Sequence, residues 1–78
     1  MENETTSIFP IGTFTNRLKE LRKDRLLTLQ EVAKILDCTI SLVSRHERGE
    51  REITADMIKK YSGLYKCRDH EIFFETVF

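Results

Sequence analysis

The chain has 78 residues, enough for one small domain, because chains of this size bury only about 60% of the surface that their unfolded form exposes. A large two-domain enzyme is therefore excluded for these residues. With 33% charged and 40% hydrophobic residues, the composition is typical of a globular chain rather than a disordered one. Lys and Arg number 13 and Asp and Glu number 13, so the formal net charge is +0. Proteins that bind nucleic acid often carry an excess of basic residues, so a neutral total argues weakly against such a partner unless the charge is unevenly distributed.

The amino-terminal residues and the cysteines indicate a cytoplasmic protein. Residues 1–4 are acidic where a secretory signal would be basic, and no apolar run approaches the roughly 18 residues that span a bilayer. We therefore expect no membrane partner. Cys38 and Cys67 are too few for a disulfide scaffold. Cys67 and His70 have a C-x-x-H spacing, but a structural zinc site needs four ligands and only Cys38 and His46 remain as donors, which is too weak a pattern for a site. We therefore expect no metal and no cofactor.

The spacing of apolar residues predicts an all-α domain preceded by a flexible arm. Residues 1–12 form the predicted arm, because Pro10 and Gly12 stand among polar residues. No alternation typical of strands occurs. The helical period predicts five short helices: from near Thr13 to about Arg25, from Leu29 to Leu36, from Ile40 to Arg48, from after Thr54 to Tyr65, and from about Asp69 onward.

The predicted helices have recognisable end signals. Thr28, Thr39 and Thr54 are expected to be N-caps. Glu31, three residues after Thr28, is expected to complete a capping box. Gly49 is expected to end the third helix, since glycine most easily adopts the left-handed conformation beyond a helix end.

The second and third helices form a predicted helix-turn-helix. Only residues 37–39 separate them, so they must cross sharply. The helical period turns Val43 and His46 inward. The outward face of the third helix then holds Ile40, Ser41, Ser44, Arg45 and Arg48. On such a face the arginine can hydrogen-bond to guanine, and the serine hydroxyls can donate hydrogen bonds to base edges or accept them. The isoleucine can make an apolar contact with a thymine methyl group. The amide groups at the amino ends of both helices suit phosphates.

Three motifs occur in order, R-L-K-E-L-R at residues 17–22, L-T-L-Q-E-V-A at 27–33 and S-L-V-S-R-H-E-R-G at 41–49. With them, residues 14–73 resemble the Cro and phage-repressor type helix-turn-helix regulators, the XRE family. The resemblance implies a five-helix, lambda-repressor-like DNA-binding domain. It also implies a homodimer on a near-palindromic operator of double-stranded DNA.

The resemblance implies roles for individual residues. Those for base readout are Ile40, Ser41, Ser44 and Arg45. Those beside the phosphates are Thr28, Leu29, Thr39, Arg48 and Arg51. Relatives often carry a glutamine at the position of Leu29, and its side chain contacts phosphate. Leucine cannot make this contact, so only the backbone amide of Leu29 can serve. Arg22 and Glu47 match the family's internal salt bridge. Asp37 replaces a usual glycine, which is tolerable because Asp adopts the left-handed region more readily than most residues. His46 replaces a common apolar residue, and we expect a half-buried packing histidine rather than a pH switch.

The end of the chain is unusually apolar. Ile72 and Phe73 match core positions, so the domain is expected to span residues 13–73. Phe74, Val77 and Phe78 make residues 74–78 an apolar tail. We expect this tail to form a contact between two copies, because a two-fold protein suits a two-fold operator.

A sequence-specific transcriptional regulator, in the first place a repressor, is the favoured function. Two alternatives would use the same DNA-binding domain: an antitoxin that also binds a toxin, and a restriction-modification controller. In each case a protein partner could control the regulator. A different class is a protein-interaction module that has lost DNA readout. We expect no enzyme, because no Ser, His and Asp set, carboxylate pair or phosphate loop emerges.

The neutral total hides an uneven distribution of charge. Residues 17–51, which contain the motifs, hold nine basic and six acidic side chains, and the other segments carry the compensating negative charge. We therefore expect weak non-specific attraction to DNA and discrimination by a few contacts from the third helix.

Overall fold

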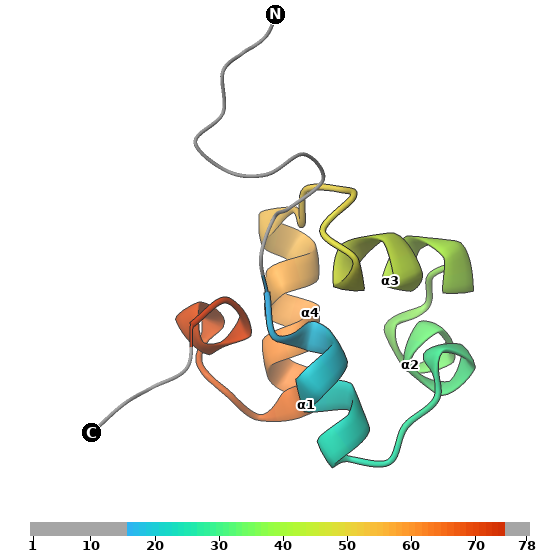
Figure 1. The fold of residues 1–78 in the computed structure, drawn as a ribbon, viewed down its shortest axis with the longest axis horizontal. Helices are drawn as coiled ribbons and strands as arrows, with labels where there is room; N and C mark the ends of the chain where they lie inside the picture. Colours follow the sequence, from blue (N-terminus) through green and yellow to red (C-terminus); the bar gives the residue numbers. More distant parts are fainter. Residues whose placement is uncertain (1–15, 75–78) are drawn as a thin grey trace, which may run out of the picture.

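The computed structural model describes residues 16–74, and this part of the chain is helical without any strand (Figure 1). Its elements are α1 (Leu18–Asp24), α2 (Leu29–Leu36), α3 (Ile40–Glu47), α4 (Ala55–Tyr65) and a 3-10 turn, η1 (Asp69–Ile72). The all-α prediction is confirmed. The fifth predicted helix is a four-residue 3-10 turn, so the described chain has four α-helices rather than five. The predicted arm, residues 1–12, lies outside the described residues.

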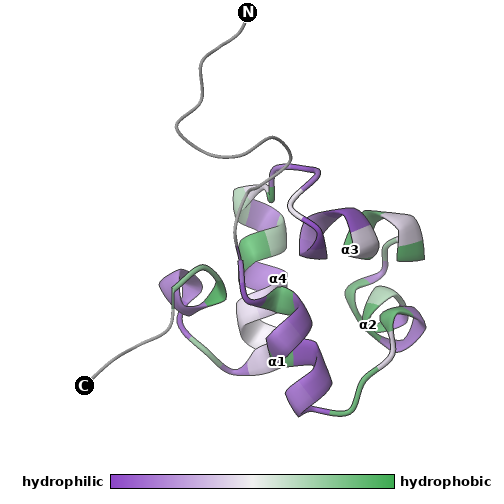
Figure 2. Cartoon of the chain, in the orientation of Figure 1, coloured by the Kyte–Doolittle hydropathy of each residue, from purple (hydrophilic) through white to green (hydrophobic). Residues whose placement is uncertain are grey.

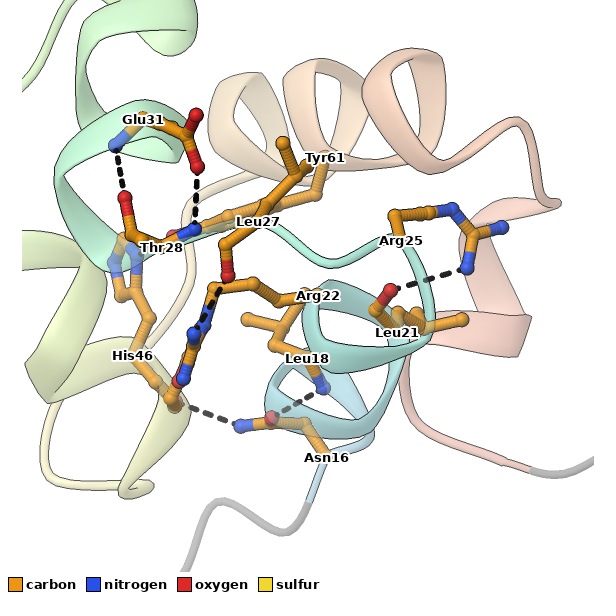
Figure 3. Close-up of polar contacts among 11 residues, drawn as sticks. Asn16, Leu18, Leu21, Arg22, Arg25, Leu27, Thr28, Glu31, His46 and Tyr61 are labelled. Atoms are coloured by element: carbon orange, nitrogen blue, oxygen red, sulfur yellow. Dashed lines mark hydrogen bonds and ion pairs between the residues drawn. The ribbon is translucent and has the colours of Figure 1, made fainter.

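The predicted N-caps are confirmed. Thr28 Oγ1 accepts a hydrogen bond from the amide of Glu31 at 3.1 Å, and the amide of Thr28 donates to Glu31 Oε1 at 2.8 Å (Figure 3). Thr39 Oγ1 accepts from the amide of Leu42, and Thr54 Oγ1 from that of Met57. Because these threonines satisfy amides that have no partner inside a helix, α2, α3 and α4 begin one residue after each of them.

The predicted end of α3 is nearly correct. Gly49 adopts φ 70°, in the left-handed region that favours glycine. Its amide donates to the carbonyl of His46 at 3.1 Å, and the amide of Glu50 donates to the carbonyl of Arg45 at 3.0 Å. These two bonds complete the cap, so α3 ends at Glu47 with Arg48 as its C-cap, one residue earlier than predicted.

The predicted start of the first helix is wrong for residues 16 and 17, which are not helical. Asn16 Oδ1 accepts from the amide of Leu18 at 3.0 Å, while its Nδ2 donates to the carbonyl of His46 at 2.7 Å (Figure 3). Asparagine hydrogen-bonds nearby backbone in this way in preference to sitting inside a helix. The amide of Arg17 donates to the carbonyl of Ile72 at 2.6 Å, so α1 begins only at Leu18.

Every element contributes to one core. The apolar residues that are fully buried are Leu18, Val32, Val43, Tyr61, Tyr65 and Ile72. Each helix carries both hydrophobic and hydrophilic residues (Figure 2), as expected of helices that bury one face. α3 packs against both α1 and α2, and α4 packs against η1. The core therefore fixes α3 from its inner side and leaves its outer side open.

Candidate nucleic-acid interface

The turn between α2 and α3 determines how α3 is presented. Asp37 adopts φ 57°, as its tolerance of the left-handed region predicted. The next residue, Cys38, donates its amide to the carbonyl of Ala33 at 2.9 Å, and Thr39 caps α3. The chain therefore reverses within residues 37–39, and α3 lies across α2 at the edge of the molecule (Figure 1).

The two sides of α3 differ as the helical period predicts. Val43 and His46 are buried against the core. On the outer side Ile40 is 47% exposed, and Ser41 and Arg45 are also exposed. Ser44 is only half-buried. The four residues predicted to read bases therefore share the accessible side of one helix, which is the arrangement a major-groove contact needs.

The residues predicted to contact phosphates lie at the ends of the same two helices. The hydroxyl oxygens of Thr28 and Thr39 accept cap hydrogen bonds, so each hydroxyl proton is free to donate elsewhere. Leu29 packs against the core, which leaves only its amide for a phosphate. Arg48 and Arg51 are exposed after α3.

Glu47 points inward rather than toward a DNA-facing surface. Arg22 Nε lies 2.7 Å from Glu47 Oε2, and Arg22 Nη2 lies 3.1 Å from Glu47 Oε1. Arg22 Nη1 also donates to the carbonyl of Leu27 at 2.9 Å (Figure 3). The side chains of Arg22 and Glu47 are only 11% and 5% exposed. Hydrogen bonding to Glu47 holds the pKa of Arg22 above its usual value, and the pair ties α1 to the end of α3.

His46 is fully buried, which goes beyond the half-buried position expected for it. Its Nδ1 lies 2.8 Å from the hydroxyl oxygen of Tyr61 on α4, and the two rings meet edge to face. Burial, with the positive charge of Arg51 adding to it, lowers the pKa of His46. Burial also raises the pKa of Tyr61. Both groups are therefore neutral near pH 7 and share one hydrogen bond that joins α3 to α4.

We expect the stability of the domain to fall as the pH drops below about 6.5. The folded chain keeps His46 neutral, whereas the unfolded chain takes up a proton there, so this contribution is complete above the unfolded pKa and is lost on acidification. The loss should reach at most about 1.4 kcal/mol per pH unit, measured by urea unfolding between about pH 7 and pH 5. His46→Gln should abolish this slope, whereas His70→Gln, which changes an exposed histidine, should leave it. An equal slope in His46→Gln would contradict this assignment.

Two residues that organise the domain have almost no signal in the sequence. Asn16 joins the start of α1 to the last turn of α3, as described above. Arg25 donates from Nη1 to the carbonyl of Leu21 at 3.1 Å and from Nη2 to that of Tyr65 at 2.5 Å. Its guanidinium lies 5.3 Å from the centre of the Tyr65 ring. Only the general preference for a basic side chain near a helix carboxyl end pointed to Arg25.

Neither cysteine is placed for redox or metal chemistry. Cys38 and Cys67 are free and partly buried, and burial raises the pKa of both thiols. They are therefore protonated near pH 7 and pack as small apolar side chains. Within residues 16–74 no group of three or more His, Cys, Asp or Glu side chains could hold a metal ion. In the same range no helix has the length and apolar character required to cross a bilayer.

Comparison with known proteins identifies the domain. A sequence profile described as helix-turn-helix matches residues 18–72, which extends from the first residue of α1 to the last of η1. A search of curated proteins and a search of solved structures gave no match. The matched span is well over half of the chain and contains the α2–turn–α3 unit whose outer side is open. The chain therefore belongs to the Cro and phage-repressor type helix-turn-helix family, the XRE family of DNA-binding transcriptional regulators.

Proposed function

We propose that this protein is a repressor that binds a near-palindromic operator as a homodimer and reads it with α3. The observation that carries the proposal is the division of α3 into two sides. Its buried side is fixed by Val43 and His46, while Ile40, Ser41 and Arg45 are exposed together. The carboxylate of Glu47, which would repel phosphate, is held inward by Arg22. A repressor of this kind acts by occupying a promoter.

The chemistry of the outer side of α3 suits base readout in the major groove. Arg45 can donate two hydrogen bonds to one guanine, a contact that contributes roughly 1–3 kcal/mol of discrimination. The hydroxyls of Ser41 and Ser44 can donate or accept, and Ile40 can contact a thymine methyl. Phosphate contacts would come from Arg48 and Arg51, from the hydroxyls of Thr28 and Thr39, and from the amide of Leu29 at the amino end of α2. These contacts would place α3 in register with its site.

The experiment that tests this function is a selection of bound duplexes from random DNA. We expect a palindrome whose half-sites lie about one helical turn apart, because a two-fold dimer presents two copies of α3. A single half-site without symmetry would contradict the dimer. No enrichment even at low salt, where phosphate contacts are strongest, would contradict DNA readout and favour the protein-interaction module.

The homodimer contact is proposed at the apolar tail, residues 74–78. Phe74 is 68% exposed, although phenylalanine is costly to leave in water. Val77 and Phe78 lie outside the described residues. Sharing such side chains between two copies would remove them from water and set the two α3 helices at a fixed distance.

A chain truncated after Phe73 is therefore expected to sediment as a monomer at concentrations where the full chain is a dimer. The truncation removes none of the buried core residues. The truncated chain should therefore still be folded and show a thermal unfolding transition. Leu26→Ala serves as the control, because Leu26 is a large apolar residue that is 90% exposed elsewhere on the molecule, and it should not change the sedimentation coefficient. A truncated chain that remains a dimer would refute the tail contact.

A further inference from the structure

One acidic side chain is fixed among the cations at the carboxyl end of α3. Because Gly49 turns the chain at φ 70°, the amide of Glu50 donates to the carbonyl of Arg45 at 3.0 Å. This bond places Glu50 directly beyond the last turn of α3, between Arg48 and Arg51 in the chain. Glu50 Oε1 lies 3.1 Å from Arg48 Nη2.

The pair between Arg48 and Glu50 differs from the pair between Arg22 and Glu47. The side chains of Arg48 and Glu50 are 55% and 51% exposed, so water screens their attraction and the pair adds little to the stability of the fold. Glu47 lies inward, and its negative charge is compensated by the guanidinium of Arg22. Glu50 instead leaves a carboxylate on the surface beside Arg48, one of the side chains that the proposed function assigns to DNA.

We propose that Glu50 limits the affinity of this protein for DNA by competing with phosphate for Arg48. This inference rests on the proposed function. An arginine that binds a phosphate releases a condensed counterion, which makes phosphate contacts the main source of sequence-independent affinity. Arg48 must leave the carboxylate before it binds a phosphate, and the freed carboxylate then lies near the negative duplex. Glu50 is thus an affinity-setting residue that weakens binding to any duplex, so that occupancy depends on the base contacts of α3.

Glu50→Gln tests this competition, because glutamine keeps the size of the side chain and removes its charge. We expect affinity for the selected operator and for a scrambled duplex to rise by a similar factor, about two- to fivefold. The plot of log affinity against log salt should become steeper by about one, the slope of one added phosphate contact. Fluorescence anisotropy at several salt concentrations measures both quantities, and an unchanged melting temperature verifies the fold.

Glu52→Gln provides the matched control. Glu52 is an exposed acid two residues further along the same loop, and no side chain in residues 16–74 forms an ion pair with it. Both substitutions change the net charge equally, so bulk charge alone predicts equal effects. We expect Glu52→Gln to have the smaller effect. In an Arg48→Gln background, Glu50→Gln should have no larger effect than Glu52→Gln, since the competition needs both partners.

The outcomes separate this inference from the proposed function. Equal effects of Glu50→Gln and Glu52→Gln, or an undiminished effect in the Arg48→Gln background, would overturn the competition while leaving DNA binding intact. An unchanged affinity in Glu50→Gln, with a wild-type chain that binds its operator, would do the same. A wild-type chain that binds no duplex at low salt would overturn both the function and the role of Glu50.

Discussion

Glu47→Ala is expected to lower the free energy of unfolding by about 3–5 kcal/mol, because it removes one partner of a buried ion pair. Arg22 is only 11% exposed, so its guanidinium would lose its charged partner without regaining full contact with water. The carbonyl of Leu27 would remain as its hydrogen-bond acceptor, and a neutral acceptor does not compensate the charge. Urea unfolding at pH 7 measures the loss. On this account, any fall in DNA binding by the variant follows from the loss of fold.

Glu20→Ala is the control for this experiment. Glu20 also pairs with an arginine of the same region, Arg17 at 2.8 Å, but its side chain is 55% exposed. Screening by water makes such pairs weak, so unfolding should be nearly unchanged. Unaltered stability in Glu47→Ala, together with weaker DNA binding, would show that Glu47 acts at the interface and that its structural assignment is wrong.

Arg45→Ala is expected to weaken binding to the selected operator by a factor of about 5 to 150, the range that corresponds to one two-point contact with a guanine. The loss for a scrambled duplex should be much smaller, because phosphate contacts carry no sequence information. Arg45 is exposed on α3, and alanine is at least as good a helix former, so the melting temperature should not fall. Competition between operator and scrambled duplex measures the change in selectivity.

Lys23→Ala is the control for Arg45→Ala. Lys23 is an exposed cation on α1, outside the α2–turn–α3 unit, and its removal changes the net charge by the same amount. It should weaken binding to both duplexes slightly and equally. A loss of selectivity as large in Lys23→Ala as in Arg45→Ala would assign the effect to overall charge rather than to a base contact.

The parts of the fold that the sequence predicts depend on local chemistry. Thr28 with Glu31 defines the start of α2 within four residues, and Gly49 defines the end of α3 in the same way. Both signals act between neighbours in the chain, so they can be read without knowing the tertiary structure. The inward position of Val43 and the outward position of Ile40 follow equally from the helical period.

The missed parts depend on contacts between distant segments. Asn16 stops α1 from extending backward because it reaches the carbonyl of His46, thirty positions away. Ile53 lies in the loop between α3 and α4, where no helical period indicates an inward side, yet it is buried because this loop folds onto the core. Leu26 adopts φ 56° and is exposed just beyond the end of α1. Its amide donates to the carbonyl of Lys23 and the amide of Leu27 donates to that of Arg22, which is the left-handed cap that usually holds glycine, so no local pattern predicted a leucine there.

Charge counting illustrates the same limit. The sequence shows nine basic side chains in residues 17–51, but it cannot show which of them are engaged within the domain. Arg22 and Arg25 hold α1 to other elements, and Arg48 pairs with Glu50. The cations that remain available on and after α3 are therefore fewer than the count implies. Weak non-specific attraction to DNA therefore stays our prediction.

The most direct test of DNA readout by α3 is the change in backbone amide chemical shifts when the selected duplex is added to the labelled chain. We predict the largest changes at residues 39–45 and at the amino end of α2, with small changes along α4. Largest changes on the exposed side of α4 or on η1, with residues 39–45 unaffected, would contradict the assignment of α3 as the DNA-reading helix.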